Sequence, residues 1–324
     1  MIRETAAHIV ATIGPSSRGL AVALRDAGAT AFRLNASHTR LAELAEQAAG
    51  ICQALSECPL IIDLQGAKMR LGLFAERPLR AGERIRFALS ASGQEIPLPH
   101  KEIFAAVAVG DTLGCDDGRL RFRLLGVSAD ALETVALVDG TLRPRKGVNV
   151  LEHPVLLTDL SEFDQTCIRM TSNLGNVGFA FSFMKDGSEA DWIRRRAPDC
   201  SIVGKVERRE ATENVHRIAS AVDAIWICRG DLGAQLGPAA MARWVSAYDP
   251  RQEPSPVLMA GQVLEHLTTH AAPTRSEVCH LFDLVTRGYS GFVLSDETAI
   301  GVDPVGAVRV LRSLLEDFSQ LPTQ

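Results

Sequence analysis

The feature that most constrains the fold is a repeated unit, in which a short apolar run ends in a glycine or polar cluster and leads into an amphipathic helical pattern. Eight such runs cover residues 8–13, 29–35, 59–65, 176–182, 201–207, 223–229, 255–260 and 290–295. Each run is almost continuously apolar, as is typical of strands buried on both faces. Eight strand and helix units predict an α/β fold, a (β/α)8 barrel, with a doubly wound open sheet as the structural alternative.

The third unit is interrupted, because no helical pattern follows Gly72. From about Leu73 to Arg145 the sequence turns to short alternating stretches, ERIRFAL, DTLGCDDGRLRFRLLGV and LETVALV, separated by Gly, Asp and Pro. Such stretches are typical of antiparallel strands. We therefore expect an inserted β-rich domain at residues 73–145, within a barrel domain formed by residues 1–72 and 146–324.

Composition excludes several classes of protein. The net charge is −5 and there is no basic run of the kind that follows a phosphate backbone, so we expect no nucleic-acid partner. The seven cysteines form no C-x-x-C pair, which favours reduced thiols. No apolar run approaches the length of a membrane span or a signal peptide. We expect a cytoplasmic protein that acts on small molecules, and the sequence permits a homo-oligomer.

Polar side chains gather at the carboxyl ends of the predicted strands, where (β/α)8 barrels build their sites. The strand ends carry Arg33, Asn35, Ser37, His38, Asp63, Lys68, Arg70, Ser182, Lys205, Glu207, Arg229, Asp231, Ser295 and Glu297. Two acids at consecutive strand ends, Glu207 and Asp231, suit a hard divalent cation. Lys205 shares a strand face with Glu207, and with the arginines it indicates a multiply anionic ligand such as a phosphate ester. The alternative for any one pair is a structural ion pair at the barrel rim.

The stretch RGDLG at residues 229–233 fits the same site. Its glycines allow backbone N–H groups to approach an anion, and the N-terminus of the following helix favours negative charge.

Ten sequence blocks occur in the order and with the approximate spacing of the signature blocks of the pyruvate kinase family. They are HIVATIGPSS, FRLNASHT, IIDLQGAKMRLG, CDDGRL, RKGVNV, FSF, GKVERREA, ICRGDLG, PTRSEV and LSDETAIG. The chain thus resembles this family over almost its entire length. The resemblance implies a TIM barrel with an inserted lid domain over the nucleotide, and phosphoryl transfer between phosphoenolpyruvate and ADP, a step of glycolysis.

The resemblance also implies roles for individual residues. Glu207 and Asp231 match ligands of Mg²⁺ or Mn²⁺, and Lys205 matches the lysine that stabilises the transferring phosphoryl group and the enolate. Arg33 and Arg70 match arginines that contact the phosphoryl group. Positions near the nucleotide, ADP or ATP, are Pro15, His38, Asp117 and Lys146. Substrate-binding positions are Ser182, Gly230, Asp231, Gly261 and Ser295.

Four departures from the family pattern qualify these roles. The first lies in the monovalent cation site, which corresponds to Asn35, Ser37, Asp63, Leu64 and Lys68. Leu64 and Lys68 stand in place of a Thr and a Glu, as in potassium-independent members, so we expect no K⁺ requirement. The second is Gly261, at the position of a threonine that contacts the substrate carboxylate region. Because glycine lacks the threonine side chain, there is room at this position for a larger substrate.

The other two departures concern length and the third strand. The chain ends soon after the eighth predicted helix, so the resemblance implies no C-terminal effector domain and hence a non-allosteric protein. Gln65 replaces a usual lysine, and the segment after RGDLG is shortened.

Three functions are compatible with these residues. The first is a Mg²⁺-dependent phosphotransferase that acts on phosphoenolpyruvate or a related enolpyruvyl acid. The second is a Mg²⁺-dependent lyase, an aldolase or decarboxylase that stabilises the enolate of a 2-oxo acid. The third is a homologue that binds ligand without turnover. Retention of the lid motifs and Lys146 favours the phosphotransferase, whereas Gly261 favours the lyase.

Overall fold

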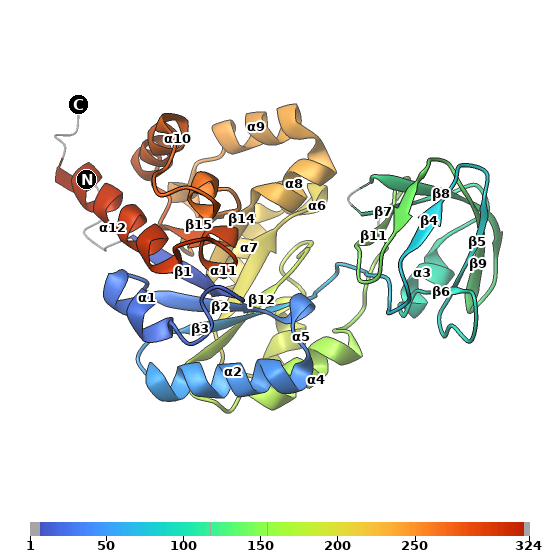
Figure 1. Ribbon diagram of the computed structural model, residues 1–324, viewed down its shortest axis with the longest axis horizontal. Coiled ribbons are helices and arrows are strands. Elements are labelled where there is room, and N and C mark those ends of the chain that lie inside the picture. Colours follow the sequence, from blue (N-terminus) through green and yellow to red (C-terminus); the bar gives the residue numbers. More distant parts are fainter. Residues whose placement is uncertain (1–6, 117, 154, 321–324) are drawn as a thin grey trace. The chain divides into compact units, whose positions relative to one another are not determined.

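The computed structural model describes residues 7–116, 118–153 and 155–320, and the side chain of His38 is not described. The chain divides into two compact units, residues 1–66 with 160–324, and residues 67–159 (Figure 1). The inserted domain expected at residues 73–145 lies within the second unit, and its bounds stay a prediction. Among the described residues, no helix is both long enough and apolar enough to span a membrane.

The first unit is a closed barrel of eight parallel strands, which confirms the predicted fold class (Figure 1). Strand β1 pairs with both β2 and β16, so the sheet has no free edge and the open-sheet alternative is excluded. The strands are β1 (His8–Ile13), β2 (Ala31–Asn35), β3 (Leu60–Leu64), β12 (Val177–Phe181), β13 (Ile202–Val206), β14 (Ala224–Cys228), β15 (Val257–Ala260) and β16 (Gly291–Leu294). Five of them, β3, β12, β13, β15 and β16, are buried at every residue, as is typical of strands covered on both faces.

Apolar side chains from all eight strands fill the barrel interior. Because side chains alternate between the two faces of a strand, every second residue points inward. The resulting cluster consists of Val10, Ala31, Ile61, Ala180, Val203, Trp226, Cys228, Leu258, Ala260 and Val293. This cluster closes the barrel interior below the carboxyl ends of the strands.

Helices follow the strands, and several begin at capping signals that are legible in the sequence. Ser161 accepts the N–H of Asp164 at the start of α4 (Glu162–Thr171), and Thr274 with Glu277 forms a capping box at α10 (Arg275–Thr286). The remaining helices of this unit are α1 (Ala21–Ala27), α2 (Leu41–Ala54), α5 (Ala190–Arg194), α6 (Arg209–Glu213), α7 (Val215–Ala221), α8 (Arg229–Leu236), α9 (Pro238–Ala247), α11 (Asp296–Ala299) and α12 (Pro304–Gln320). Short 3₁₀ turns are η1 (Ala36–His38), η2 (Pro250–Gln252) and η3 (Glu265–Thr268).

The second unit contains the antiparallel strands that the alternating stretches predict. Its larger sheet has the order β11-β7-β8-β9-β5-β6, and β10 pairs with β4. The elements are β4 (Arg77–Leu79), β5 (Arg84–Ala88), β6 (Ile96–Pro97), α3 (Lys101–Ala106), β7 (Thr112–Cys115), β8 (Leu120–Val127), β9 (Ala131–Ala136), β10 (Gly140–Leu142) and β11 (Val148–Val150). Along β8, buried residues alternate with exposed arginines, and the buried Phe122 packs edge-on against Phe87 at a centroid distance of 5.1 Å.

Candidate active site

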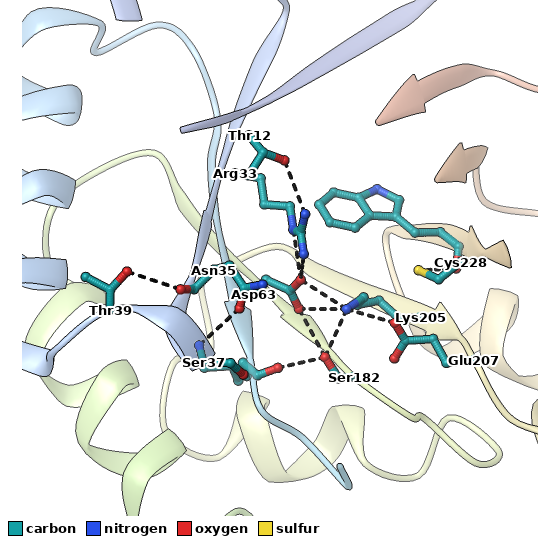
Figure 2. A network of polar contacts seen from close by, with 12 residues as sticks. Thr12, Arg33, Asn35, Ser37, Thr39, Asp63, Ser182, Lys205, Glu207 and Cys228 are labelled. Carbon is teal, nitrogen blue, oxygen red and sulfur yellow. Dashed lines mark hydrogen bonds and ion pairs between the residues drawn. The ribbon is translucent and has the colours of Figure 1, made fainter. Parts of the chain in front are cut away.

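The candidate site begins where the apolar interior of the barrel ends. Five polar residues each lie two positions after a member of the apolar cluster, and so on the same inward side of the barrel wall. They are Thr12, Arg33, Asp63, Ser182 and Lys205. All five are linked by hydrogen bonds or ion pairs (Figure 2). Because alternate residues of a strand point to the same face, these five side chains point into the barrel as the apolar cluster does. They form a polar layer above that cluster.

The ammonium of Lys205 lies at the centre of the layer. Its Nζ donates to both carboxylate oxygens of Asp63 at 3.0 Å and to Ser182 Oγ at 2.9 Å, and it lies 2.9 Å from Glu207 Oε1 (Figure 2). The residue is only 6% exposed. The Lys205 ammonium is thus held in one position by Asp63 of β3, by Ser182 directly after β12 and by Glu207 directly after β13.

Arg33 forms the second cation of the layer. Its Nε donates to Asp63 Oδ2 at 2.8 Å, and its Nη1 donates to Thr12 Oγ1 at 3.2 Å. Asp63 thereby bridges Arg33 and Lys205, and it is 1% exposed. The two cations are oriented by the same buried carboxylate.

Charge balance sets the direction of the pKa shifts. Burial disfavours ionised Asp63, but Lys205 and Arg33 outweigh it and hold the pKa of Asp63 below its usual value. Burial likewise opposes the charge on Lys205, but Asp63 and Glu207 raise the pKa of Lys205 above its usual value. The lysine is therefore a permanent cation and not a general base at neutral pH.

Glu207 and Asp231 supply a second negative region. Glu207 Oε2 accepts the N–H of Phe183 at 2.8 Å, and the residue is 1% exposed. Burial raises the pKa of Glu207, Lys205 opposes the rise, and the charge of Asp231 adds to it. A divalent cation would stabilise negative charge on this pair of carboxylates, which are the oxygen ligands that Mg²⁺ prefers.

The residues present fit a magnesium ion with open coordination positions. Arg33 and Lys205 carry two positive charges, whereas Asp63, Glu207 and Asp231 carry three negative charges, so the group has an excess of negative charge. Within the described part of the chain, no group of three or more His, Cys, Asp or Glu side chains is arranged to hold a metal. Mg²⁺ commonly takes one or two carboxylates and fills its remaining positions with water and substrate oxygens, which is compatible with a two-carboxylate site.

The stretch at residues 229–233 differs from the expectation in one respect. Helix α8 begins at Arg229, so Gly230 and Asp231 lie in its first turn and not in a loop before it. Arg229 turns toward the end of the neighbouring strand, where Nε and Nη2 donate to the carbonyl of Gly261 at 3.0 and 2.7 Å. Its Nη2 also donates to the carbonyl of Gln262 at 2.8 Å. Within this stretch, Arg229 thus anchors the loop after β15, and Asp231 is the residue that the sequence predicts to bind the metal together with Glu207.

Gly261 adopts a left-handed conformation, with φ of +80°. Gln262 follows with φ of +55°, and the Arg229 bonds hold this pair in place. A Cβ built on Gly261 would lie 3.5 Å from the amide nitrogen of Gly230. The left-handed backbone conformation at position 261 therefore favours glycine and disfavours a β-branched residue such as threonine.

Most oxygen atoms of the predicted monovalent cation site already have partners in the protein. Asn35 Oδ1 accepts the N–H of Ser37 at 3.0 Å (Figure 2), and the carbonyl of Leu64 accepts a hydrogen bond from Ser182 Oγ at 2.8 Å. The Asp63 carboxylate pairs with Lys205 and Arg33, as described above. Three of the four barrel residues expected to hold a cation already accept hydrogen bonds from the protein.

Four predicted site residues belong to the second unit. Arg70 donates from Nη1 to the carbonyl of Arg145, and Lys146 pairs with Asp116 at 2.8 Å. Lys68 lies over Gly147, where an added Cβ would be 3.1 Å from Lys68 Cε. Asp117 lies outside the described residues. The roles of these four remain predictions.

The other predicted positions lie at the carboxyl ends of barrel strands. Ser295 follows β16, and its N–H donates to Glu297 Oε2 at 2.7 Å. Pro15 is exposed in the turn after β1, and His38 ends the 3₁₀ turn η1 after β2. These positions share the end of the barrel that carries Lys205.

Two further buried acids lie near the site: Glu297, which the sequence places at a strand end, and Asp164, which its sequence pattern does not indicate as a site residue. Glu297 is fully buried and accepts the N–H groups of Leu264 and Ser295, so it joins the loop after β15 to the end of β16. Asp164 is fully buried and accepts the N–H groups of Gln65 and Gly66. The only local signal at Asp164 is the S-x-x-D pattern from Ser161, which indicates a helix start.

Replacing Asp63 with Asn is expected to lower the free energy of unfolding by about 3 kcal/mol at pH 7, because both cations lose a buried partner. Asp63 has a lowered pKa in the folded state, so its contribution is present above the unfolded pKa of about 4 and is lost as the pH falls through the folded value. Urea unfolding of both proteins between pH 7 and pH 3 measures this difference. A difference that stayed constant over the whole range would contradict the assignment.

Comparison with known proteins identifies relatives over most of the chain. Residues 3–308 match the family described as "Pyruvate kinase, barrel domain". Two proteins of Agrobacterium vitis, both named pyruvate kinase, are each 33% identical to this chain over 96% and 95% of its length, which is 69% and 67% of theirs. A pyruvate kinase of Thermoplasma acidophilum is 29% identical over 94% of this chain and 57% of its own length.

Proposed function

The chain belongs to the pyruvate kinase family, and on that premise we propose that it is a Mg²⁺-dependent phosphotransferase acting between phosphoenolpyruvate, or a related enolpyruvyl acid, and ADP. The observation that carries this proposal is the buried Lys205 ammonium, held by Asp63 and Glu207 at the carboxyl end of the barrel. A fixed cation in a water-poor site is suited to stabilise negative charge that develops during reaction.

The reaction breaks the bond between phosphorus and the enol oxygen and forms a bond to the terminal phosphate oxygen of ADP. The enolate that remains gains a proton at C3 to give the 2-oxo acid. In this scheme Lys205 and Arg33 neutralise charge on the phosphoryl oxygens and on the enolate. Their shared partner Asp63 keeps both cations oriented before substrate binds, so little reorganisation is needed.

Glu207 and Asp231 would hold the magnesium ion, which would neutralise negative charge on the substrate when bound. The backbone N–H of Gly230, in the first turn of α8, would receive the substrate carboxylate, because a helix N-terminus favours an anion. Lys146 and Asp117, of the second unit, and Pro15 and His38, of the barrel, are proposed as nucleotide-binding residues, and Arg70 as a residue that contacts the phosphoryl group. Ser182 and Ser295 complete the proposed substrate-binding set.

The lyase remains the alternative, and Gly261 is the residue that bears on it. Family membership supports the phosphotransferase, since the named relatives are pyruvate kinases. Initial rates of pyruvate formation from phosphoenolpyruvate and ADP, coupled to lactate dehydrogenase, distinguish the two. Cleavage of a 2-oxo acid without nucleotide, in the absence of any transfer to ADP, would replace the proposal with the lyase.

We expect the rate to be independent of K⁺. The Asn35, Asp63 and Leu64 oxygens accept hydrogen bonds from the protein, and the proposed role of the Lys68 ammonium is to supply the missing charge. At matched ionic strength, exchange of KCl for tetramethylammonium chloride should change the initial rate by less than about twofold. Lys68→Glu should introduce a K⁺ requirement. A wild-type rate that needs K⁺ would overturn this part of the proposal.

Gly261→Ala is expected to raise the KM for phosphoenolpyruvate about tenfold, because the new methyl group would cover the Gly230 amide proposed to bind the carboxylate. The left-handed φ adds a loss of about 1 kcal/mol in unfolding free energy. Gly237→Ala is the matched control, since Gly237 has φ of +79° and open space at its Cβ position. Equal KM values in the two variants would show that substrate does not approach position 261.

A further inference from the structure

Asp164 is a buried acid that the proposed reaction does not use. It lies in the first turn of α4, the first helix after the chain re-enters the barrel unit at residue 160, and its exposed fraction is 0%. Its two oxygens accept separate backbone N–H groups, Oδ1 from Gln65 at 2.9 Å and Oδ2 from Gly66 at 3.0 Å. These are the last two residues before the chain leaves the barrel unit.

The geometry differs from an ordinary helix cap. An acid at the third position of a helix commonly reaches back to the N-cap N–H. Asp164 instead reaches 98 and 99 residues away in sequence, to the turn after β3. Burial raises the pKa of Asp164 to about 7, and the two backbone N–H groups act in the opposite direction. Two donors aimed at two oxygens favour the carboxylate over the neutral acid.

The turn that Asp164 holds lies directly against Ser182. A Cβ added to Gly66 would come within 2.1 Å of the Ser182 carbonyl oxygen, so the turn and the end of β12 fit only with glycine there. Two residues before Gly66, the Leu64 carbonyl accepts a hydrogen bond from Ser182 Oγ at 2.8 Å. The Ser182 hydroxyl in turn accepts from Lys205 Nζ at 2.9 Å.

We propose that Asp164 is a positioning residue of the active site, whose carboxylate fixes the turn at residues 64–66 and thereby sets the Ser182 hydroxyl and the Lys205 ammonium. A hydroxyl that donates to the Leu64 carbonyl presents its lone pairs to Lys205, whereas a displaced turn would release it to rotate. This inference rests on the function proposed for Lys205. It adds Asp164, a residue outside the barrel strands, to the residues that orient the Lys205 ammonium.

Asp164→Asn is the direct test, because Asn has the same shape but can accept only one of the two N–H groups on its oxygen. Its NH₂ group would face the other backbone donor. We expect kcat to fall about 10- to 100-fold, the range found when an outer partner of a site residue is removed. KM for phosphoenolpyruvate should change less, because the direct substrate contacts remain.

Asp223→Asn is the matched control. Asp223 also accepts a backbone N–H through its carboxylate, that of Ile202 at 2.8 Å, but at the opposite end of β13 from Lys205. Asp223 is exposed, so this control tests whether losing a carboxylate bond to a backbone N–H is enough by itself to lower kcat. The proposal requires that only Asp164→Asn lowers kcat.

A double-mutant cycle with Ser182→Ala tests whether the effect passes through the hydroxyl. If it does, Asp164→Asn should reduce kcat much less in the Ser182→Ala background than in the wild type. Equal reductions in both backgrounds would overturn the proposed connection, as would wild-type kcat in Asp164→Asn.

NMR provides a readout that does not depend on turnover. In the wild type, the amide proton shifts of Gln65 and Gly66 should titrate with a midpoint near the Asp164 pKa of about 7. The ammonium signal of Lys205 should include a transition with the same midpoint. The titratable groups that face Asp164 are Asp63, with a lowered pKa, and Cys167, whose pKa burial raises to about 12, so neither titrates in this range.

This readout separates the two proposals. If the amide shifts and the Lys205 signal move together while no phosphoryl transfer is detected, the proposed function fails and the coupling stands. If the amides titrate and the Lys205 signal has no such transition, the coupling is wrong, whatever the reaction.

Discussion

Replacement of Lys205 with Met is expected to lower kcat for phosphoryl transfer by about 10³-fold or more, since the variant loses a preorganised cation at the reacting oxygens. It is also expected to lower the free energy of unfolding by about 3–5 kcal/mol, because Asp63 and Glu207 would remain buried without their shared ammonium. Circular dichroism and urea unfolding measure the second effect alongside initial rates.

Two further variants separate catalysis from stability. Lys185→Met removes a half-exposed lysine that pairs with Asp186 at 3.6 Å, and it should leave kcat unchanged. Adding Asp63→Asn to Lys205→Met removes one of the two carboxylates that lost the ammonium and leaves one cation, Arg33, with one buried anion, Glu207. Stability should therefore recover in part while kcat stays low. Recovery of activity in that double variant, or wild-type kcat in Lys205→Met, would show that Lys205 is not the central cation.

Asp231→Asn is expected to weaken Mn²⁺ binding at least about 100-fold, because the proposed site has only two protein carboxylates and loses the charge of one. Electron paramagnetic resonance of free Mn²⁺ measures the affinity without any assumption about the reaction. Glu207→Gln should have a comparable effect. Asp223→Asn, at the opposite end of the barrel strands, should bind Mn²⁺ as the wild type does. Unchanged affinity in both ligand variants would place the metal elsewhere.

The barrel was predictable because its signal is repeated and redundant. Each strand is a short, nearly continuous apolar run, and the predicted runs contain the observed strands, for example Ile202–Val206 within residues 201–207. Strand ends differ by one or two residues because polar residues at the ends, such as Glu207, lie beyond the last ladder pairing. Errors of this size do not change the face on which a side chain lies when the period of two is counted from the core.

The inward polar layer was also predictable in part. Arg33, Asp63 and Lys205 stand two residues beyond apolar inward positions, so strand periodicity places them together once the barrel is closed. The periodicity does not reveal their pairing. That Asp63 bridges both cations follows from the order of strands around the barrel and from side-chain lengths.

Hydrogen bonds between side chains and distant backbone groups could not be predicted from the sequence. The carboxylate of Asp164 accepts hydrogen bonds from the N–H groups of residues 98 and 99 positions earlier in the chain, whereas the sequence around Asp164 indicates only a helix start. The anchor from Arg229 to the Gly261 carbonyl is similarly invisible, because a charged residue beside a glycine more often indicates a surface turn. The start of α8 at Arg229 was missed for the same reason, since two glycines in one stretch disfavour a helix.

The most direct test of the proposed function is phosphorus NMR of the purified protein with phosphoenolpyruvate, ADP and Mg²⁺, in parallel samples with and without K⁺. The proposal predicts that the phosphoenolpyruvate signal declines and the three ATP signals appear at similar rates in both samples. Lys205→Met, at the same concentration, should leave the spectrum unchanged over the same period. If phosphoenolpyruvate and ADP persist with the wild-type protein in both samples, although Mn²⁺ binds with wild-type affinity, the protein does not catalyse this transfer.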